Sequence, residues 1–136
     1  MDEIKNLNIN KTFQMATQNH KEGNIVKAKS LYSKVLELDP NHENANINIG
    51  VIFQQLGELQ KAKKCYENVL KNNSNNIRAY TNLGVIFKNL ERIDEAIKSF
   101  DKAIEISPNS LEAQINLGVI FQELEEDEKA LKCYEQ

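Results

Sequence analysis

The strongest constraint in this chain is a six-residue pattern that recurs three times at a step of 34 residues. It reads Asn-Ile/Leu-Gly-Val-Ile-Phe and occupies residues 48–53, 82–87 and 116–121. A fixed period of about 20–50 residues indicates that each period forms one supersecondary unit, whose apolar face must be covered by its neighbours. We therefore expect a stack of repeated units rather than a globule around one central core.

Other positions keep the same step along the chain. The residues in phase are Ala28, Ala62, Ala96 and Ala130; Tyr32, Tyr66, Phe100 and Tyr134; Gly23, Gly57, Glu91 and Glu125; and Pro40, Ser74 and Pro108. Within a unit, apolar residues recur at spacings of three and four, which is typical of amphipathic helices. A glycine between two such stripes permits a left-handed helix end, and a proline stops the second helix. Each unit is therefore predicted to be a pair of helices.

The helices are expected at 9–22, 25–38, 43–56, 59–72, 77–90, 93–106, 111–124 and 127–136, with ends placed to within about 2–4 residues. Gly50, Gly84 and Gly118 fall in the middle of a first helix, where glycine costs roughly 1 kcal/mol against alanine. We interpret them as points where the paired helix approaches closely. Asn41, Asn75 and Asn109 follow the unit boundaries and are interpreted as N-terminal helix caps.

The pattern of Leu-Gly, an aromatic residue, alanine, a second aromatic residue and proline over 34 residues resembles the tetratricopeptide repeat (TPR). The resemblance covers residues 9–136, with repeats at 9–42, 43–76, 77–110 and an incomplete 111–136, preceded by an extension at 1–8. The first repeat departs from the pattern, because Met15-Ala16 replaces Leu-Gly and Asn19 replaces phenylalanine. The resemblance implies an all-α fold, a right-handed α-solenoid of antiparallel helix hairpins with about four repeats.

In this family the first helix of each hairpin lines a concave groove, and the groove commonly binds a peptide or protein. Carried over to this chain, the peptide-binding residues are Asn48, Asn82, Asn116, Ile47, Val51, Arg78, Val85, Lys88, Ile115 and Val119. An asparagine amide offers a donor and an acceptor, so it can pair with one peptide unit of an extended backbone. The three asparagines resemble the ladder in the TPR arm of protein O-linked N-acetylglucosamine transferases.

Two readings of the asparagines remain open. Asparagine makes up 18 of the 136 residues, and repeat duplication copies any residue into phase without a binding role. However, the three ladder positions lie in helix interiors, where asparagine is unfavourable and caps nothing. Some relatives clamp a terminal carboxylate with lysine, asparagine and arginine; the matching positions here are Phe13, Thr17, Asn48, Arg78 and Asn82. These residues lack the required positive charges, so we do not expect that mechanism.

Composition limits the remaining functions. The net charge of −3 and the absence of a basic patch argue against nucleic acid, and no apolar run approaches the about 20 residues of a membrane span. The polar start is unlike a signal peptide, and Cys65 and Cys133 lie too far apart in a stack to pair. Reduced thiols then predict a cytoplasmic protein. The sequence shows no metal-ligand spacing, cofactor motif or catalytic constellation, so we expect no metal, cofactor or enzyme activity.

The predicted function is a non-catalytic module that binds an extended peptide in its groove. The alternative is the substrate-presenting TPR arm of a larger glycosyltransferase-like enzyme whose catalytic domain follows Gln136. Arg78 and Lys88 predict a ligand with acidic residues. Leu131 and Tyr134 would leave apolar surface at the last repeat, which makes self-association through the repeat ends possible.

Overall fold

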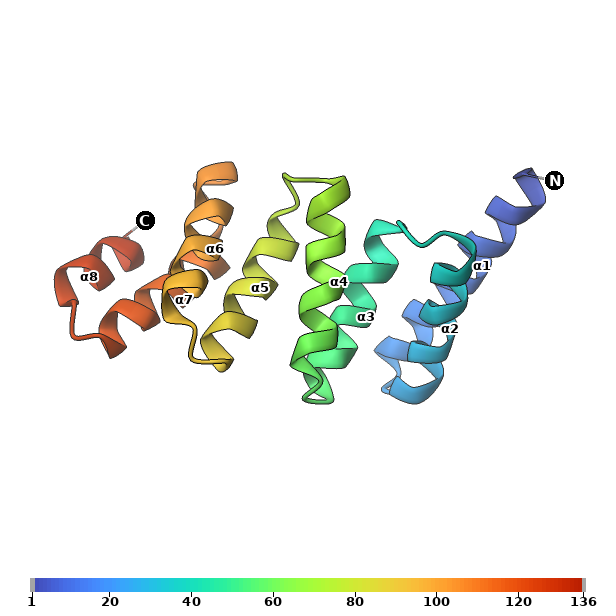
Figure 1. Cartoon of the computed structure of the whole chain (residues 1–136), viewed down its shortest axis with the longest axis horizontal. Coiled ribbons are helices and arrows are strands. Elements are labelled where there is room, and N and C mark those ends of the chain that lie inside the picture. Colours follow the sequence, from blue (N-terminus) through green and yellow to red (C-terminus); the bar gives the residue numbers. More distant parts are fainter. Residues whose placement is uncertain (1, 136) are drawn as a thin grey trace. The chain divides into compact units, whose positions relative to one another are not determined.

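A computed structural model describes residues 2–135, which form eight α-helices and no β-strand (Figure 1). The helices are α1 (Asp2–Lys21), α2 (Ile25–Leu38), α3 (Glu43–Gln55), α4 (Leu59–Asn72), α5 (Ile77–Asn89), α6 (Ile93–Ile106), α7 (Leu111–Glu123) and α8 (Asp127–Glu135). Consecutive helices pair as antiparallel hairpins, α1 with α2, α3 with α4, α5 with α6 and α7 with α8. The all-α fold and the eight expected helices are confirmed.

The first helix differs from its expected start. α1 begins at Asp2 rather than near residue 9, so the residues that we expected to form a separate extension continue the helix. Nothing in Asp2–Asn8 breaks a helix, and Asp2 and Glu3 place negative charge in the first turn, where the helix dipole favours it. Ile9 is then buried against the first hairpin, which ties this longer helix to the fold.

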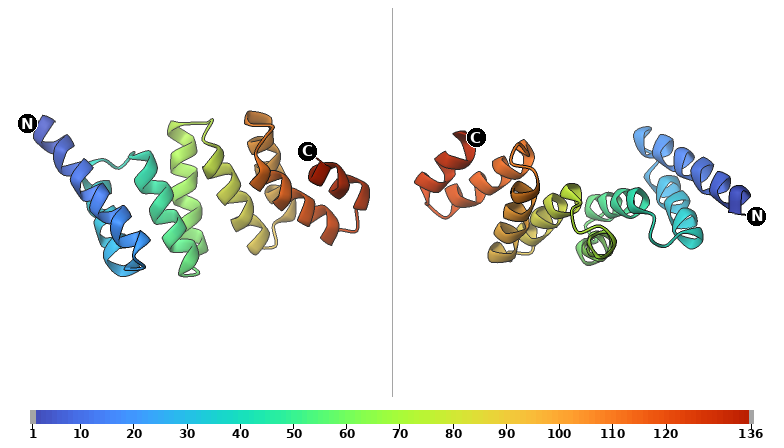
Figure 2. Two further views of the ribbon diagram at one scale, coloured as in Figure 1. Left: turned by 180° about the vertical axis from the view of Figure 1, so that it is seen from behind. Right: turned by 90° about the horizontal axis from the view of Figure 1, so that it is seen from above.

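The chain divides into two compact units, Met1–Asn72 and Asn73–Gln136. In the first unit, α2 packs against both α1 and α3 (Figure 2). The core of this unit includes Tyr32, Val35 and Ile52. In the second unit, α6 packs against α5 and α7, and its core includes Phe100, Leu117 and Ile120. Each unit thus joins two hairpins through a shared apolar layer.

The mid-helix glycines lie where the second helix of the hairpin approaches the first. A Cβ atom added at Gly50 would stand 2.7 Å from the ring of Tyr66, and one at Gly84 would stand 2.5 Å from the ring of Phe100. Real side-chain atoms cannot approach so closely, so only glycine accommodates these rings. The close-approach interpretation of the glycines is therefore confirmed.

The residues that cap the first helices differ from those that the sequence predicted. The N-cap residues are His42, Asn76 and Ser110, each one position after the asparagine that we expected to cap. His42 Nδ1 accepts from the Ala45 amide at 3.1 Å, and Asn76 Oδ1 accepts from the Ala79 amide at 2.9 Å. The assignment of Asn41, Asn75 and Asn109 as caps was wrong because each lies two positions before the first helical residue, and the N-cap is the residue directly before the helix.

The turns inside the hairpins contain four residues with positive φ. Gly23 and Gly57 have φ of 82° and 77°, whereas Glu91 and Glu125 at the same repeat position both have φ of 60°. A Cβ atom makes the left-handed region unfavourable, so the two glutamates are strained where the glycines are not. The sequence had placed all four residues at one turn position, and the backbone confirms it.

Replacing Glu91 or Glu125 with glycine is expected to stabilise the protein by about 0.5–1 kcal/mol each, because glycine relieves the left-handed strain. The opposite change, Gly57→Ala, is expected to destabilise by a similar amount, although no atom lies within 4 Å of the added Cβ. Urea denaturation measures each change. Equal stability of Gly57→Ala and the wild type would show that the φ angle carries no strain.

Candidate functional site

The three ladder asparagines lie in the interiors of α3, α5 and α7, and each is half-buried. Asn116 Nδ2 donates to the Glu112 carbonyl oxygen of its own helix at 2.9 Å, which leaves its amide oxygen and second N–H for another group. Asn82 makes no side-chain hydrogen bond with residues 2–135. The donors and acceptors of Asn82 and Asn116 are therefore largely uncommitted to the fold, whereas the Asn48 amide acts on the Tyr32 hydroxyl of α2.

Two other side-chain amides, those of Asn46 and Gln114, differ from the ladder asparagines in what they bind. Asn46, which is buried, donates to the Pro40 carbonyl oxygen at 3.0 Å and to the His42 carbonyl oxygen at 3.1 Å. Gln114 at the equivalent position of the fourth repeat is buried too and donates to the Pro108 carbonyl oxygen. These two side chains tie a helix to the turn before it, so their role is structural. The ladder asparagines differ because they are half-buried and do not bond to the turn before their helix.

The predicted apolar groove residues do not all face the same environment. Val51, Val85 and Val119 are half-buried, three positions after each ladder asparagine, and Ile115 is 46% exposed. Ile47, in contrast, is 0% exposed, so its side chain is not available to a ligand and its assignment to the groove was wrong. The equivalent Thr81 is also buried, in a unit where α5 packs against α7. Ile47 and Thr81 are therefore closed to a ligand, whereas Ile115 at the same repeat position is exposed.

The charged groove residues are only partly free. Lys88 on α5 forms a salt bridge with Glu123 on α7, with 3.3 Å between Nζ and Oε1. Arg78 is exposed near the start of α5. A ligand carboxylate at Lys88 must therefore compete with Glu123, which weakens the expectation that Lys88 selects acidic ligands.

A pocket that the sequence did not predict opens beside Asn48. Its lining comes from three helices of the first unit, with Thr17, His20 and Lys21 on α1, Tyr32 on α2 and Asn48 on α3, and its volume is about 290 Å³. The ring of Tyr32 lies 6.1 Å from that of His20 in an edge-on arrangement. The sequence signal was the substitution of His20 for the glutamine that the second and fourth repeats carry at this position, Gln54 and Gln122.

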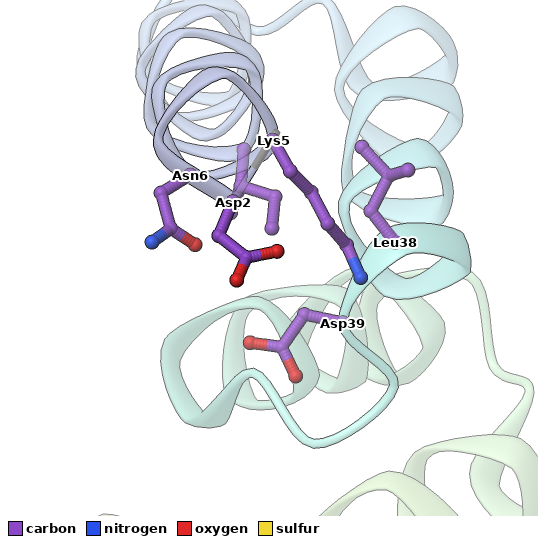
Figure 3. Close-up of a pocket in the computed structure, with 6 residues that line it drawn as sticks. Asp2, Lys5, Asn6, Leu38 and Asp39 are labelled. Carbon is purple, nitrogen blue, oxygen red and sulfur yellow. The ribbon is translucent and has the colours of Figure 1, made fainter.

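A second pocket of about 340 Å³ lies in the same unit, between the start of α1 and the end of α2. Figure 3 shows the Lys5 side chain extending from α1 past Leu38 toward Asp39, with Asp2 on the same side. The charges are mixed, and two carboxylates are too few for a metal centre. No group of three or more histidine, cysteine, aspartate or glutamate side chains is placed to hold a metal within residues 2–135.

Both cysteines are free thiols. Burial raises the pKa of Cys65 to about 11, so this thiol is neutral and poorly nucleophilic at neutral pH. Cys133 also has a raised pKa, through burial and the nearby charge of Asp101. Among the described helices, none has the length and hydropathy needed to cross a bilayer.

Sequence models of the tetratricopeptide repeat match residues 20–84, 77–110 and 111–136 of the chain. Together the matches run from residue 20 to residue 136. The chain belongs to the tetratricopeptide repeat family, and its fold is the all-α TPR-type solenoid expected from the sequence. A comparison with curated protein sequences found no match.

Solved TPR structures share this fold. A crystal structure of MamA has a TM-score of 0.86 at 20% identity, covering 93% of this chain and 74% of MamA. PilF of Pseudomonas aeruginosa has a TM-score of 0.84 at 25% identity, covering 96% of this chain and 60% of PilF. The first TPR domain of Spaghetti (RPAP3), solved with an HSP90 peptide, has a TM-score of 0.82 at 23% identity. The match covers 87% of this chain and 94% of the Spaghetti domain. At 20–25% sequence identity, these similarities show that the chains share a fold.

Proposed function

We propose that this chain is a non-catalytic interaction module that binds an extended peptide along the first helices of its hairpins. Asn48, Asn82 and Asn116 pair with the peptide backbone, and Val51, Val85 and Val119 contact its side chains. The coarser part of this proposal follows from the family, because TPR domains bind proteins or peptides, as the peptide-bound Spaghetti domain illustrates.

The observation that carries the finer part is the state of the three asparagine amides. They lie mid-helix and half-buried, and none caps a helix; Asn116 bonds only within its own helix, whereas the Asn48 amide also acts on the Tyr32 hydroxyl of α2. Asparagine costs several tenths of a kcal/mol against alanine in a helix interior, roughly 0.5 kcal/mol per position. Three asparagines that destabilise their helices and cap none of them favour a role in recognition. Backbone pairing fits because an amide matches the donor and acceptor of a peptide unit.

The valines support an extended rather than a helical ligand. Each lies three residues after a ladder asparagine on the same helix, so amide and apolar contacts alternate from one first helix to the next. An extended peptide presents its backbone groups and its side chains in a similar alternation. The binding surface would therefore recognise few side chains of the peptide and would bind peptides of many sequences.

A selection from a random peptide library tests the proposal. The whole chain is immobilised, and enriched peptides are titrated as synthetic probes together with scrambled versions of the same composition. We expect micromolar binders whose scrambled forms lose less than about tenfold in affinity, because backbone contacts are independent of sequence. Absence of any enriched peptide, or complete loss on scrambling, would contradict backbone recognition.

Two further expectations from the sequence stay predictions. A glycosyltransferase arm requires a catalytic domain beyond residue 136, and the sequence there would decide it. Self-association through the repeat ends draws support from Leu131 and Tyr134, which are 57% and 44% exposed. Sedimentation at increasing concentration would detect it as a rise in mass.

A further inference from the structure

A tyrosine and a glutamine connect the two helices of the hairpin in the second and fourth repeats. The Tyr66 hydroxyl on α4 donates to Gln54 Oε1 on α3 at 2.5 Å. Tyr134 on α8 and Gln122 on α7 form the same hydrogen bond at 3.0 Å. The glutamine oxygen is therefore occupied by a group of its own hairpin in both repeats.

The third repeat replaces both members of this pair. Phe100 lies at the tyrosine position and has no hydroxyl group, and Lys88 lies at the glutamine position and has no acceptor. The hydrogen bond within the hairpin therefore cannot form. The Lys88 side chain instead reaches from α5 to α7, where its Nζ lies 3.3 Å from Oε1 of Glu123. The two substitutions thus replace a hydrogen bond within one hairpin by an ion pair between two first helices.

The ion pair is accessible and lies close to the ladder residues of the second unit. The side chains of Lys88 and Glu123 are 29% and 58% exposed. Glu123 follows Asn116 by seven residues, which is two turns of α7 and places both side chains on one face. Lys88 follows Val85 by three residues, a spacing that also brings side chains to one side of a helix. A peptide held by Asn116 and Val85 would therefore pass beside the pair.

A cation and an anion in contact do not favour a singly charged ligand group. A ligand carboxylate can pair with Lys88 only by displacing Glu123, and a ligand ammonium group can pair with Glu123 only by displacing Lys88. In both cases one exposed ion pair replaces another, which changes the free energy little. A primary amide avoids this exchange, because its oxygen accepts a hydrogen bond while its NH₂ group donates one.

We propose that Lys88 and Glu123 select an asparagine or glutamine side chain of the ligand peptide. The amide oxygen accepts from Lys88 Nζ, the amide nitrogen donates to a carboxylate oxygen of Glu123, and the ion pair stays intact. Both hydrogen bonds have a charged partner, which makes them stronger than bonds between neutral groups. This assignment rests on the proposed function, because it needs a peptide that lies along α5 and α7. It replaces the acidic ligand residue that the sequence predicted opposite Lys88.

A residue scan of one bound peptide tests this selection. A peptide enriched from the random library is remade with glutamine, alanine, glutamate or lysine at each position in turn, and each version is titrated into the whole chain by calorimetry. We expect one position at which the glutamine version binds about fivefold more tightly than the other three versions. A scan in which no position prefers glutamine would overturn the proposal.

Variants that lack one charge connect the preferred peptide position to the ion pair. Glu123→Gln leaves Lys88 without its partner, so the preference at this position should change from glutamine to glutamate. Lys88→Gln leaves Glu123 without its partner, so the preference should change to lysine. Lys88→Glu combined with Glu123→Lys restores an ion pair of opposite direction and should restore the preference for glutamine. The same preference in the wild type and all three variants would refute the role of the pair.

The matched control is Glu105→Gln, which removes one charge from another exposed ion pair of the same unit, Lys102 with Glu105 at 3.5 Å on α6. α6 carries no ladder residue, so the preference for glutamine should remain; a change like that of Glu123→Gln would show an effect of net charge and overturn the proposal. A wild-type chain that binds no library peptide contradicts the proposed function. One that binds the peptide but accepts all four versions equally contradicts only this assignment.

Discussion

Replacing Gly84 with alanine is expected to destabilise the second unit by about 2 kcal/mol, one of the largest effects of any single methyl group in this chain. The added Cβ would stand 2.5 Å from Cε1 and 2.6 Å from Cζ of Phe100, which is completely buried. The ring has no open space to enter, so α5 and α6 must separate. Separation costs more than the roughly 1 kcal/mol that alanine gains over glycine in a helix.

Gly118→Ala is the matched control, because its Cβ would meet Tyr134 at a similar distance, 2.6 Å. Tyr134, however, is 44% exposed and can rotate away from the helix. The change should therefore be neutral or stabilise by up to about 1 kcal/mol through helix propensity. Urea denaturation gives both free energies of unfolding. Equal effects at the two sites would show that burial of the facing ring does not decide the outcome.

The triple replacement of Asn48, Asn82 and Asn116 with alanine is expected to reduce affinity for a selected peptide by about a hundredfold or more. Each asparagine can make two hydrogen bonds to the peptide, and each lost bond costs about 0.5–1.5 kcal/mol. The melting temperature should not fall, because alanine is the better helix former at all three positions and only Asn48 acts on a residue of another helix. Isothermal titration and thermal unfolding measure the two effects on the same samples.

A second triple variant, with Asn41, Asn75 and Asn109 replaced by alanine, removes as many amides from the turns before the first helices. It should retain the wild-type affinity, since these residues lie outside the ladder. If the ladder variant binds as the wild type does, the asparagines reflect repeat duplication, and the valines become the remaining basis for binding. Lost stability in the ladder variant would instead assign the asparagines a structural role.

The helices could be predicted from the sequence because each depends on local periodicity and on turn residues that recur at one position. Gly57 and Glu91 share a repeat position that predicts a left-handed turn, and Gly84 predicts a close approach of two helices; the backbone shows both features. The caps were displaced by one residue because the turn geometry after Pro40 is not visible in a hydrophobic pattern. The early start of α1 was missed because residues 2–8 carry too little apolar periodicity.

The site was less predictable for a different physical reason. A repeat pattern gives the face of an isolated helix, but burial depends on which helix packs beside it, so Ile47 was placed on the wrong side. The pocket at Tyr32 of α2 depends on Ala16 and His20 of α1 together with Asn48 of α3. Each residue alone looks like an ordinary departure from the repeat, and only their convergence in space shows the pocket.

The most direct test of peptide-backbone recognition follows the side-chain amide signals of all asparagines by ¹⁵N NMR during titration with a library-selected peptide. We expect the signals of Asn48, Asn82 and Asn116 to shift together and to saturate with one dissociation constant. The signals of Asn41, Asn75 and Asn109 should stay in place. Binding that leaves the three ladder signals unmoved, or that moves both sets alike, would contradict the asparagine ladder.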